Sequence, residues 1–138
     1  MDLVLSSEVI TRLEQIIEEE LLVNDVEHAF VVDSSGNLIA GSGSLPMHEL
    51  LPLAAVSAAN FSATRRMAQV LGQESFTVLL HKGSSRNIHL VRMDNDLMLV
   101  ILFSNDVSLG LIRLGSSRAT KQLLMALNNE EEEAKCLS

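Results

Sequence analysis

Apolar residues in the first part of the chain recur at the spacing of one helix face. They are separated by three or four residues, and the glutamates among them fall outside the stripe: Ile10, Leu13, Ile17 and Leu21. Ser6 and Ser7, followed by Glu8, are typical of a helix start. An amphipathic helix is therefore predicted from these serines to about Leu22.

Two short apolar runs follow, joined by residues that favour a tight turn. Ala29–Asp33 and Leu38–Ser42 flank the sequence SSGN, in which Gly36 can adopt a positive φ angle. Runs of this length with turn residues between them are typical of a β-hairpin. The two strands are expected to be antiparallel neighbours.

The longest periodic stretch predicts a second helix, from about His48 to Leu71. Gly72 fits the position after a helix end, and Pro52 fits if it lies in the first turn. Residues spaced alternately by four and three form an unbroken stripe that should pack on a sheet. This stripe comprises Leu50, Ala54, Ser57, Phe61, Thr64, Ala68 and Leu71.

The opposite face of this helix carries small and polar residues. Small side chains allow another backbone to approach closely, and arginines at the end of the face can anchor a carboxylate or phosphate. The face consists of Ala55, Ala59, Ser62, Arg66 and Gln69, with Ala58 and Arg65 beside them. A docking surface is one interpretation. The other is that alanine populates exposed helix faces because it is the best helix former.

Three further strands and a third helix complete the pattern. Short polar turns separate the strands, so they can form only a meander: Ser75–His81, Asn87–Met93 and Leu97–Phe103. The last strand is apolar throughout, which predicts a central position covered on both faces. A helix is expected from after Ser108 to about Leu127. Its first turns are expected to be irregular, because two glycines, at positions 110 and 115, disfavour helix.

The predicted order is α-β-β-α-β-β-β-α, an α/β (α+β) fold with a five-stranded, mostly antiparallel sheet and helices on both faces. A single domain spanning residues 1–128 fits the chain length of 138 residues. Residues 129–138 carry a run of glutamates and almost no large apolar side chain, so a mobile acidic tail is expected.

Composition narrows the class of partner. The net charge of −8 and the pI near 4.9 disfavour nucleic acid and anionic membranes, because both would repel the protein. The first residues lack the basic segment of a signal peptide, and no apolar stretch is long enough to span a membrane. A cytoplasmic protein is expected.

Candidate chemistry is sparse. His28, His48, His81 and His89 are scattered singly, without ligand spacing, so we expect no metal site and no cofactor. Cys136 stands alone, which excludes an intrachain disulfide, and nothing near it in sequence would activate it as a nucleophile. The glutamate runs fit solvated surfaces better than paired acid and base groups. The residues favour an interaction module without its own catalytic site over an enzyme.

The order of elements and several segments resemble the Roadblock family, which includes dynein light chains and prokaryotic regulators of small GTPases. The similarity covers roughly residues 8–127. It is greatest to the bacterial branch that regulates a Ras-like GTPase in cell polarity and gliding motility. The segments that carry it are Val31–Ala40, the LAAVSAANFSAT part of the second helix with Asn60, Phe76–Gly83 and Leu99–Leu114.

This resemblance implies a profilin-like fold and a homodimer, in which two sheets join edge to edge and the central helices lie side by side. The joining edge would be the strand Ser75–His81, with Phe76, Val78 and Leu80. His81 would be a turn residue of this family rather than a catalytic base.

The resemblance also implies a partner for the small face of the second helix, a Ras-like GTPase in its GTP-bound state. Its binding residues would be Ala55, Ala58, Ala59, Ser62, Arg65, Arg66 and Gln69. Such regulators speed GTP hydrolysis without an arginine finger, by favouring a conformation in which the GTPase's own catalytic groups are aligned.

Two alternatives to a GTPase activator remain. One is a dimeric adaptor of the same fold that leaves the rate of GTP hydrolysis unchanged. The other is a small-ligand sensor, which would need a polar pocket in the sheet. The uniformly aliphatic strand Leu97–Phe103 argues against such a pocket.

Overall fold

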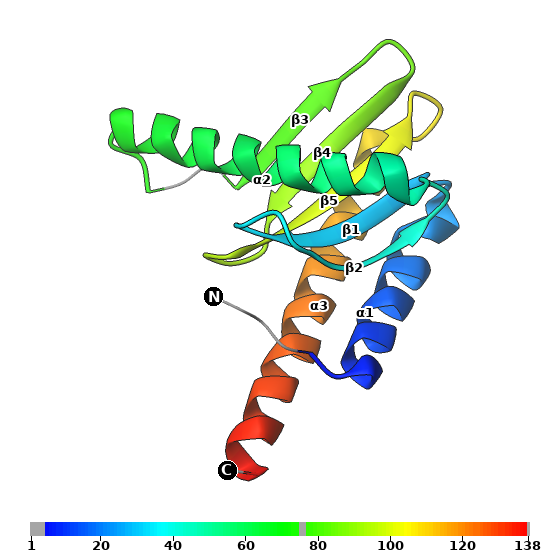
Figure 1. The fold of residues 1–138 in the computed structure, drawn as a ribbon. Coiled ribbons are helices and arrows are strands. Elements are labelled where there is room, and N and C mark those ends of the chain that lie inside the picture. Colours follow the sequence, from blue (N-terminus) through cyan, green and yellow to red (C-terminus); the bar gives the residue numbers. More distant parts are fainter. Residues whose placement is uncertain (1–4, 75–76, 138) are drawn as a thin grey trace.

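The computed structural model describes residues 5–74 and 77–137, and the side chains of residues 5–74 and 77–129. Within these ranges, three α-helices, one short 3-10 helix and five strands follow the predicted order (Figure 1). Their bounds are α1 Ser7–Glu20, η1 Leu22–Asn24, β1 His28–Asp33, β2 Leu38–Gly43, α2 Met47–Val70, β3 Val78–Lys82, β4 Arg86–Arg92, β5 Leu97–Ser104 and α3 Leu109–Leu137.

The strands form one antiparallel sheet in the order β2-β1-β5-β4-β3. The pairs β1–β2 and β3-β4-β5 are the predicted hairpin and meander. β5 lies in the middle, and every residue from Leu97 to Phe103 is buried. A strand with a neighbour on each side and helices over both faces has no polar surface to present, which explains its apolar sequence.

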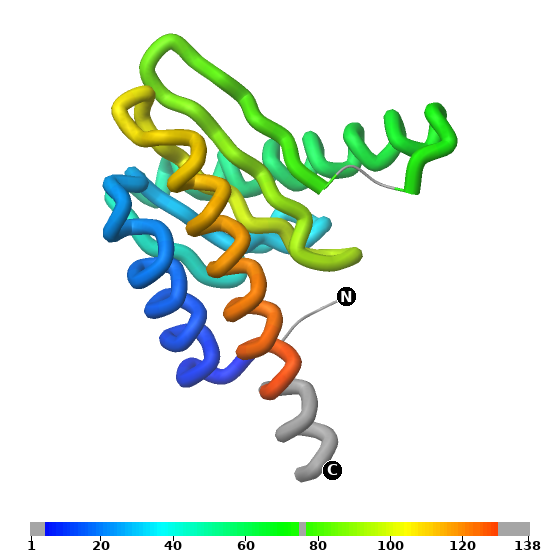
Figure 2. Tube along the Cα trace, turned by 180° about the vertical axis from the view of Figure 1, so that it is seen from behind, coloured from blue at the N-terminus to red at the C-terminus, as the bar shows by residue number. Residues whose placement is uncertain are grey.

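Helices cover both faces of the sheet. α1 and α3 lie side by side on one face, and α2 crosses the other (Figures 1 and 2). Alternate residues of β1 belong to two buried clusters. Ala29 and Val31 pack with α1 and α3, whereas Phe30 and Val32 pack beneath α2. The predicted fold class is therefore confirmed. In the described part of the chain, no helix combines the length and apolarity needed to cross a membrane.

α1 and α3 approach closely at Gly115. A Cβ atom at this position would lie 2.7 Å from the carbonyl oxygen of Glu20, at the end of α1. The side chain of Gln122 also donates a hydrogen bond of 2.8 Å to the Glu20 carboxylate. The glycine therefore permits close helix packing. α3 is helical from Leu109 onward, and the irregular first turns expected from the sequence are not found there.

α3 also extends further than expected. It continues past Leu127, the predicted end, to Leu137. The sequence beyond Leu127 is rich in glutamate, which forms helix readily, so local propensity explains the added turns. The division into a domain of residues 1–128 and a mobile tail of residues 129–138 stays a prediction.

α2 spans 24 residues and ends where the sequence predicts. Leu71 is its C-cap, and Gly72 follows with φ +70°, a left-handed conformation suited to glycine. Pro52 lies in the second turn, later than expected, since the helix begins at Met47. The packed stripe is buried except for Leu71, which is 65% exposed because the end of α2 extends past the strands (Figure 1).

Candidate partner-binding face of the central helix

α2 presents a row of small and polar side chains to solvent. Ala55, Ala59, Ser62, Arg66 and Gln69 are all exposed, and we call them the small flank. They are spaced by four and three residues, so they share one side of the helix, away from the packed stripe. Short side chains leave the helix backbone open to close approach by another molecule.

Ala58 does not belong to this surface. Its side chain is 4% exposed, because the turn between β1 and β2 packs on it. A Cβ atom at Gly36 in this turn would lie 3.3 Å from Cα of Ala55 and 3.9 Å from Cβ of Ala58. The expected binding role of Ala58 is therefore corrected, since it is a packing residue of the domain.

Hydrogen bonds to Asp33 hold the turn that borders the small flank. Oδ1 of Asp33 accepts hydrogen bonds from the backbone N–H groups of Ser35 at 3.0 Å and Asn37 at 2.9 Å. Its Oδ2 accepts from the Asn37 side chain at 3.0 Å. Ser34 donates to Asp96 in the β4–β5 turn. The small flank therefore lies beside a turn that is anchored to a second turn.

The guanidinium of Arg65 makes two contacts within its own chain. Its Nη2 donates to the carbonyl oxygen of Asn95 at 2.8 Å, and its guanidinium carbon lies 5.1 Å from the centroid of the Phe61 ring. Together with Arg92 it lines a cleft of about 250 Å³ near the end of α2. Both contacts of the Arg65 guanidinium would have to break before it could reach into a partner.

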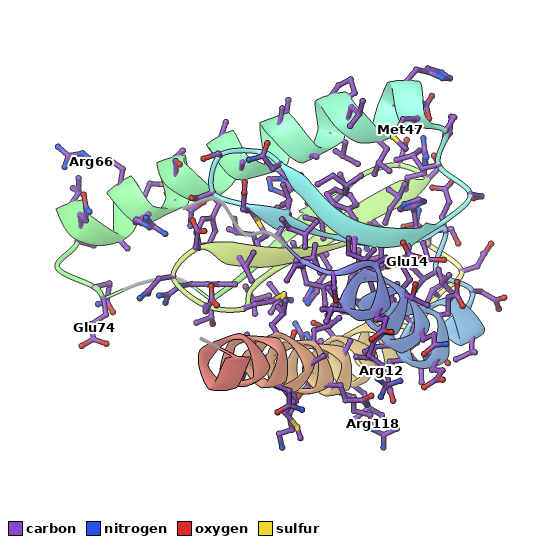
Figure 3. All side chains as sticks on the ribbon, turned by 60° about the horizontal axis from the view of Figure 1, so that its bottom comes forward. Arg12, Glu14, Met47, Arg66, Glu74 and Arg118 are labelled. Carbon is purple, nitrogen blue, oxygen red and sulfur yellow. The ribbon has the colours of Figure 1, made fainter. Side chains whose placement is uncertain are left out.

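Arg66, the next residue, points elsewhere. It projects from α2 away from the sheet, at the end of the helix opposite Met47 (Figure 3). Its Nη1 donates to Oε1 of Gln69 at 3.2 Å, a contact within the small flank itself. Of the two arginines, Arg66 is therefore the one that the small flank offers to a partner.

α2 also has a second exposed row, which was not predicted from the sequence. Val56, Met67 and Val70 are 64%, 59% and 73% exposed, and we call them the apolar strip. Asn60 lies in the same row by helical spacing, and its Nδ2 is 2.8 Å from Nε2 of His81 on β3. The apolar strip therefore lies on the side of α2 toward β3. The spacing of four and three along the row was the signal that could have revealed it.

β3 forms a border of the sheet in the described part of the chain. Two of its apolar side chains are exposed, Val78 at 50% and Leu80 at 41%. Phe76, the third residue assigned to this edge, lies outside the described residues. His81, expected in a turn, is a β3 residue paired with Ile88. A border strand offers its outer backbone groups to another strand.

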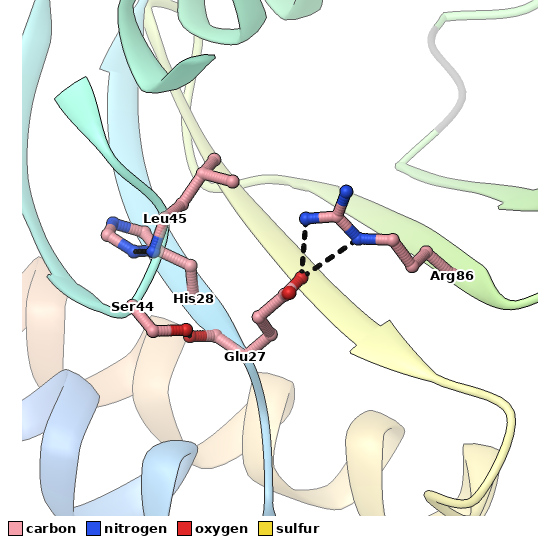
Figure 4. A network of polar contacts seen from close by, with 5 residues as sticks. All are labelled: Glu27, His28, Ser44, Leu45 and Arg86. Atoms are coloured by element: carbon pink, nitrogen blue, oxygen red, sulfur yellow. Dashed lines mark hydrogen bonds and ion pairs between the residues drawn. The ribbon is translucent and has the colours of Figure 1, made fainter. Parts of the chain in front are cut away.

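A polar network fixes the segment that leads into α2 (Figure 4). The backbone N–H of Leu45 donates to Nδ1 of His28 at 3.1 Å, which assigns the imidazole proton to Nε2. The N–H of Ser44 donates to the carbonyl oxygen of Glu27 at 2.9 Å. Arg86 pairs with the Glu27 carboxylate at 2.8 Å. These contacts tie the start of α2 to β1 and β4.

Two histidines are buried in the sheet, His28 at 5% and His89 at 2% exposed. Burial lowers the pKa of both imidazoles, and the nearby Arg113 guanidinium lowers the pKa of His89 further. Within residues 5–74 and 77–129, no group of three His, Cys, Asp or Glu side chains is placed to hold a metal ion.

Comparisons with known proteins give the geometry a context. Residues 12–103 match the family described as Roadblock/LC7 domain. The structure of Myxococcus xanthus MglB is 26% identical to this chain and superposes with a TM-score of 0.84. The alignment covers 92% of this chain and 96% of the MglB chain. A structure described as MglB with tetrameric arrangement also shares 26% identity, covers 94% of this chain and 97% of its own, and has a TM-score of 0.85.

A more distant structure confirms the expected profilin-like fold. Profilin from Schizosaccharomyces pombe covers 80% of this chain and 95% of its own, with a TM-score of 0.58. Its identity of 17% shows likeness of fold alone. No curated protein sequence matches the chain.

Proposed function

The chain belongs to the Roadblock/LC7 domain family, and from this premise we propose that it is an MglB-like homodimer that activates GTP hydrolysis by a bacterial Ras-like GTPase. The partner is a GTP-bound GTPase similar to MglA, as the resemblance of the sequence implies. The pair acts in the cytoplasm, in cell polarity or gliding motility. The chain is a regulator and has no catalytic site of its own.

The small flank of α2 carries this proposal. Ala55, Ala59 and Ser62 are exposed on a helix whose other side is buried in the domain. Such short side chains let a loop or helix of the GTPase come within van der Waals contact. Arg66 adds a cation to this flank in a protein of net charge −8, and it can pair with a carboxylate or phosphate oxygen.

The β3 border and the apolar strip support the homodimer. Pairing of β3 with its copy would extend the sheet and satisfy the outer backbone groups. The two α2 helices would then lie side by side with their apolar strips in contact. This contact removes Val56, Met67 and Val70 from water, which favours association. A structure described as MglB with tetrameric arrangement is consistent with self-association.

Activation works by selecting a conformation of the GTPase. Arg65 is engaged by Asn95 and Phe61, which disfavours its insertion beside the transferred phosphate. A flank that fits the GTPase best in its hydrolysis-competent conformation stabilises that conformation by the difference in binding free energy. The water and catalytic groups of the GTPase then carry out the reaction.

Single-turnover GTP hydrolysis tests the proposal. The GTP-loaded GTPase is mixed with a molar excess of this protein, and phosphate release is followed. The wild type should raise the rate, and Ser62→Arg should not, because a long charged side chain holds the partner away. Gln15→Arg, at an exposed position of α1 on the other face of the sheet, is the matched control and should activate like the wild type.

Arginine variants distinguish the mechanisms of activation. An arginine finger contributes about 10³- to 10⁵-fold to GTP hydrolysis. Arg65→Ala and Arg66→Ala should each lose much less activation than this, since neither supplies a finger. A loss of that size in either variant would contradict conformational selection.

An adaptor of the same fold is the alternative function. Arg66 favours it, because a long side chain on the small flank hinders the closest approach of a GTPase. An unchanged hydrolysis rate with co-elution of the two proteins would identify an adaptor. An unchanged rate without co-elution would reject the GTPase as partner.

A further inference from the structure

A cleft of about 340 Å³ lies between α3 and the β3–β4 edge of the sheet. β3 and β4 contribute an apolar wall that includes Val78 and Val91, and α3 contributes polar side chains between Arg113 and Thr120. Val91 packs with the buried cluster beneath α1 and α3. The cleft is therefore on the face of the sheet opposite α2 and is separate from the small flank.

Two buried polar atoms of the cleft lining have no hydrogen-bond partner among the described residues. They are Nδ1 of His89 and Oγ1 of Thr120. His89 is 2% exposed, and Ser116, in the same lining, is 3% exposed. Buried polar groups in folded proteins are nearly always paired, so these two atoms call for a water molecule or a ligand group as partner.

The cleft carries charge of one sign. Arg113 supplies a guanidinium, and the described residues of the lining include no carboxylate. From Leu109 to Asn129, α3 contains three cations and no acidic residue, in a chain whose net charge is −8. Guanidinium and hydroxyl donors without a competing carboxylate suit an oxyanion.

We propose that this cleft binds a small ligand that carries a phosphate group. The phosphate oxygens accept hydrogen bonds from the Arg113 guanidinium and from the hydroxyl groups of Ser116 and Thr120. His89 completes the set by donating from Nδ1, a tautomer that neutral imidazole can adopt.

The size and the apolar wall of the cleft define the rest of the ligand. Its volume of about 340 Å³ is in the range of small-molecule sites and leaves room beyond a single phosphate. Val78 and Val91 offer a hydrophobic surface to that remaining part. Phenyl phosphate, which joins an oxyanion to a flat apolar ring, is therefore a suitable probe.

NMR of protein labelled at histidine tests the site. Phenyl phosphate is added at pH 7.5 and constant ionic strength, and the ring signals are followed. The His89 signals should shift to saturation, while those of His48, exposed at the start of α2, should not. Phenol lacks the phosphate and should bind far more weakly. Absence of a saturable His89 shift with phenyl phosphate, or equal affinity for phenol, would overturn the proposal.

Paired arginine variants test the anion contact. Arg113→Gln should weaken binding of phenyl phosphate about tenfold or more, because it removes a charge-assisted hydrogen bond. Arg118→Gln removes the same charge from an exposed position of the same helix outside the cleft and should bind like the wild type. The backbone spectrum shows that each variant is folded. Equal affinity of folded Arg113→Gln and the wild type would reject the site.

Discussion

At the scale of single residues, His28 and His89 place imidazole rings where solvent barely reaches them. Burial lowers the pKa of both below the ordinary value of 6.5, so the folded protein favours the neutral rings. In the unfolded chain the ordinary pKa returns. At pH values between 6.5 and the lowered pKa values, the unfolded chain therefore binds more protons than the folded protein.

Stability should consequently fall on mild acidification. The contribution of the two histidines is complete above pH about 6.5 and is lost as the pH falls through the lowered pKa values. Urea midpoints measured from about pH 7.5 to 5.5 report this loss. His89→Gln should make the midpoint less dependent on pH, and His48→Gln, at an exposed position, should not. The same pH dependence in His89→Gln and the wild type would refute this assignment.

Neighbouring residues on α2 differ in ways that periodicity does not reveal. Arg65 contacts Asn95, whereas Arg66 points to solvent. Ala58 lies beneath the β1–β2 turn, whereas Ala59 is exposed. Consecutive residues of an α-helix point about 100° apart around its axis, so the two members of each pair meet different surroundings. From the sequence, all four residues were predicted to share one binding face. The contacts that separate Ala58 and Arg65 from it come from distant turns, whose positions depend on tertiary packing.

At the scale of elements, the α1–α3 contact depends on Gly115. In Gly115→Ala the new Cβ would lie 2.7 Å from the Glu20 carbonyl oxygen, so the helices must separate. We expect a loss of about 1–3 kcal/mol in the free energy of unfolding, despite the better helix propensity of alanine. Gly110→Ala is the control, because the nearest atom there is 3.5 Å away. Chemical denaturation compares them, and an undiminished stability of Gly115→Ala would disprove the close contact.

The apolar strip leads to a prediction about the dimer. Met67→Glu puts a charge where the two α2 helices would meet, and desolvating it should leave the protein monomeric. Met125→Glu makes the same change at a residue of α3 that is equally exposed, at 59% for both methionines, and should keep the dimer. Sedimentation equilibrium distinguishes the monomer from the dimer. A dimer that persists in Met67→Glu would place the interface elsewhere.

At the scale of the whole molecule, local patterns predicted the order of the elements, the hairpin, the meander and the central strand. The unbroken apolar run of β5 indicated the central strand, and the turn residues between the strands indicated a hairpin and a meander. The stripe on α2 indicated the face that packs on the sheet. These features depend on periods of two and 3.6 residues, which the sequence displays directly.

The surfaces formed by distant segments could not be predicted in the same way. The cleft beside α3 joins His89 of β4 to Arg113 and Thr120 of the last helix. Each residue is unremarkable in its own segment. The aliphatic β5 argued against a ligand site in the sheet, but this cleft lies at the sheet edge and does not include β5. Only the packing of α3 brings its polar groups together.

The central claim is that the small flank of α2 recognises a Ras-like GTPase in its GTP-bound state. The most direct measurement is equilibrium binding of the GTPase, loaded with GDP or a non-hydrolysable GTP analogue, to the wild type, Ala59→Arg and Gln15→Arg. The wild type and Gln15→Arg should bind the GTP-analogue form about tenfold or more tightly than the GDP form, and Ala59→Arg should lose binding while remaining folded. Equal binding by Ala59→Arg and the wild type, or no preference between the nucleotides, would contradict the claim.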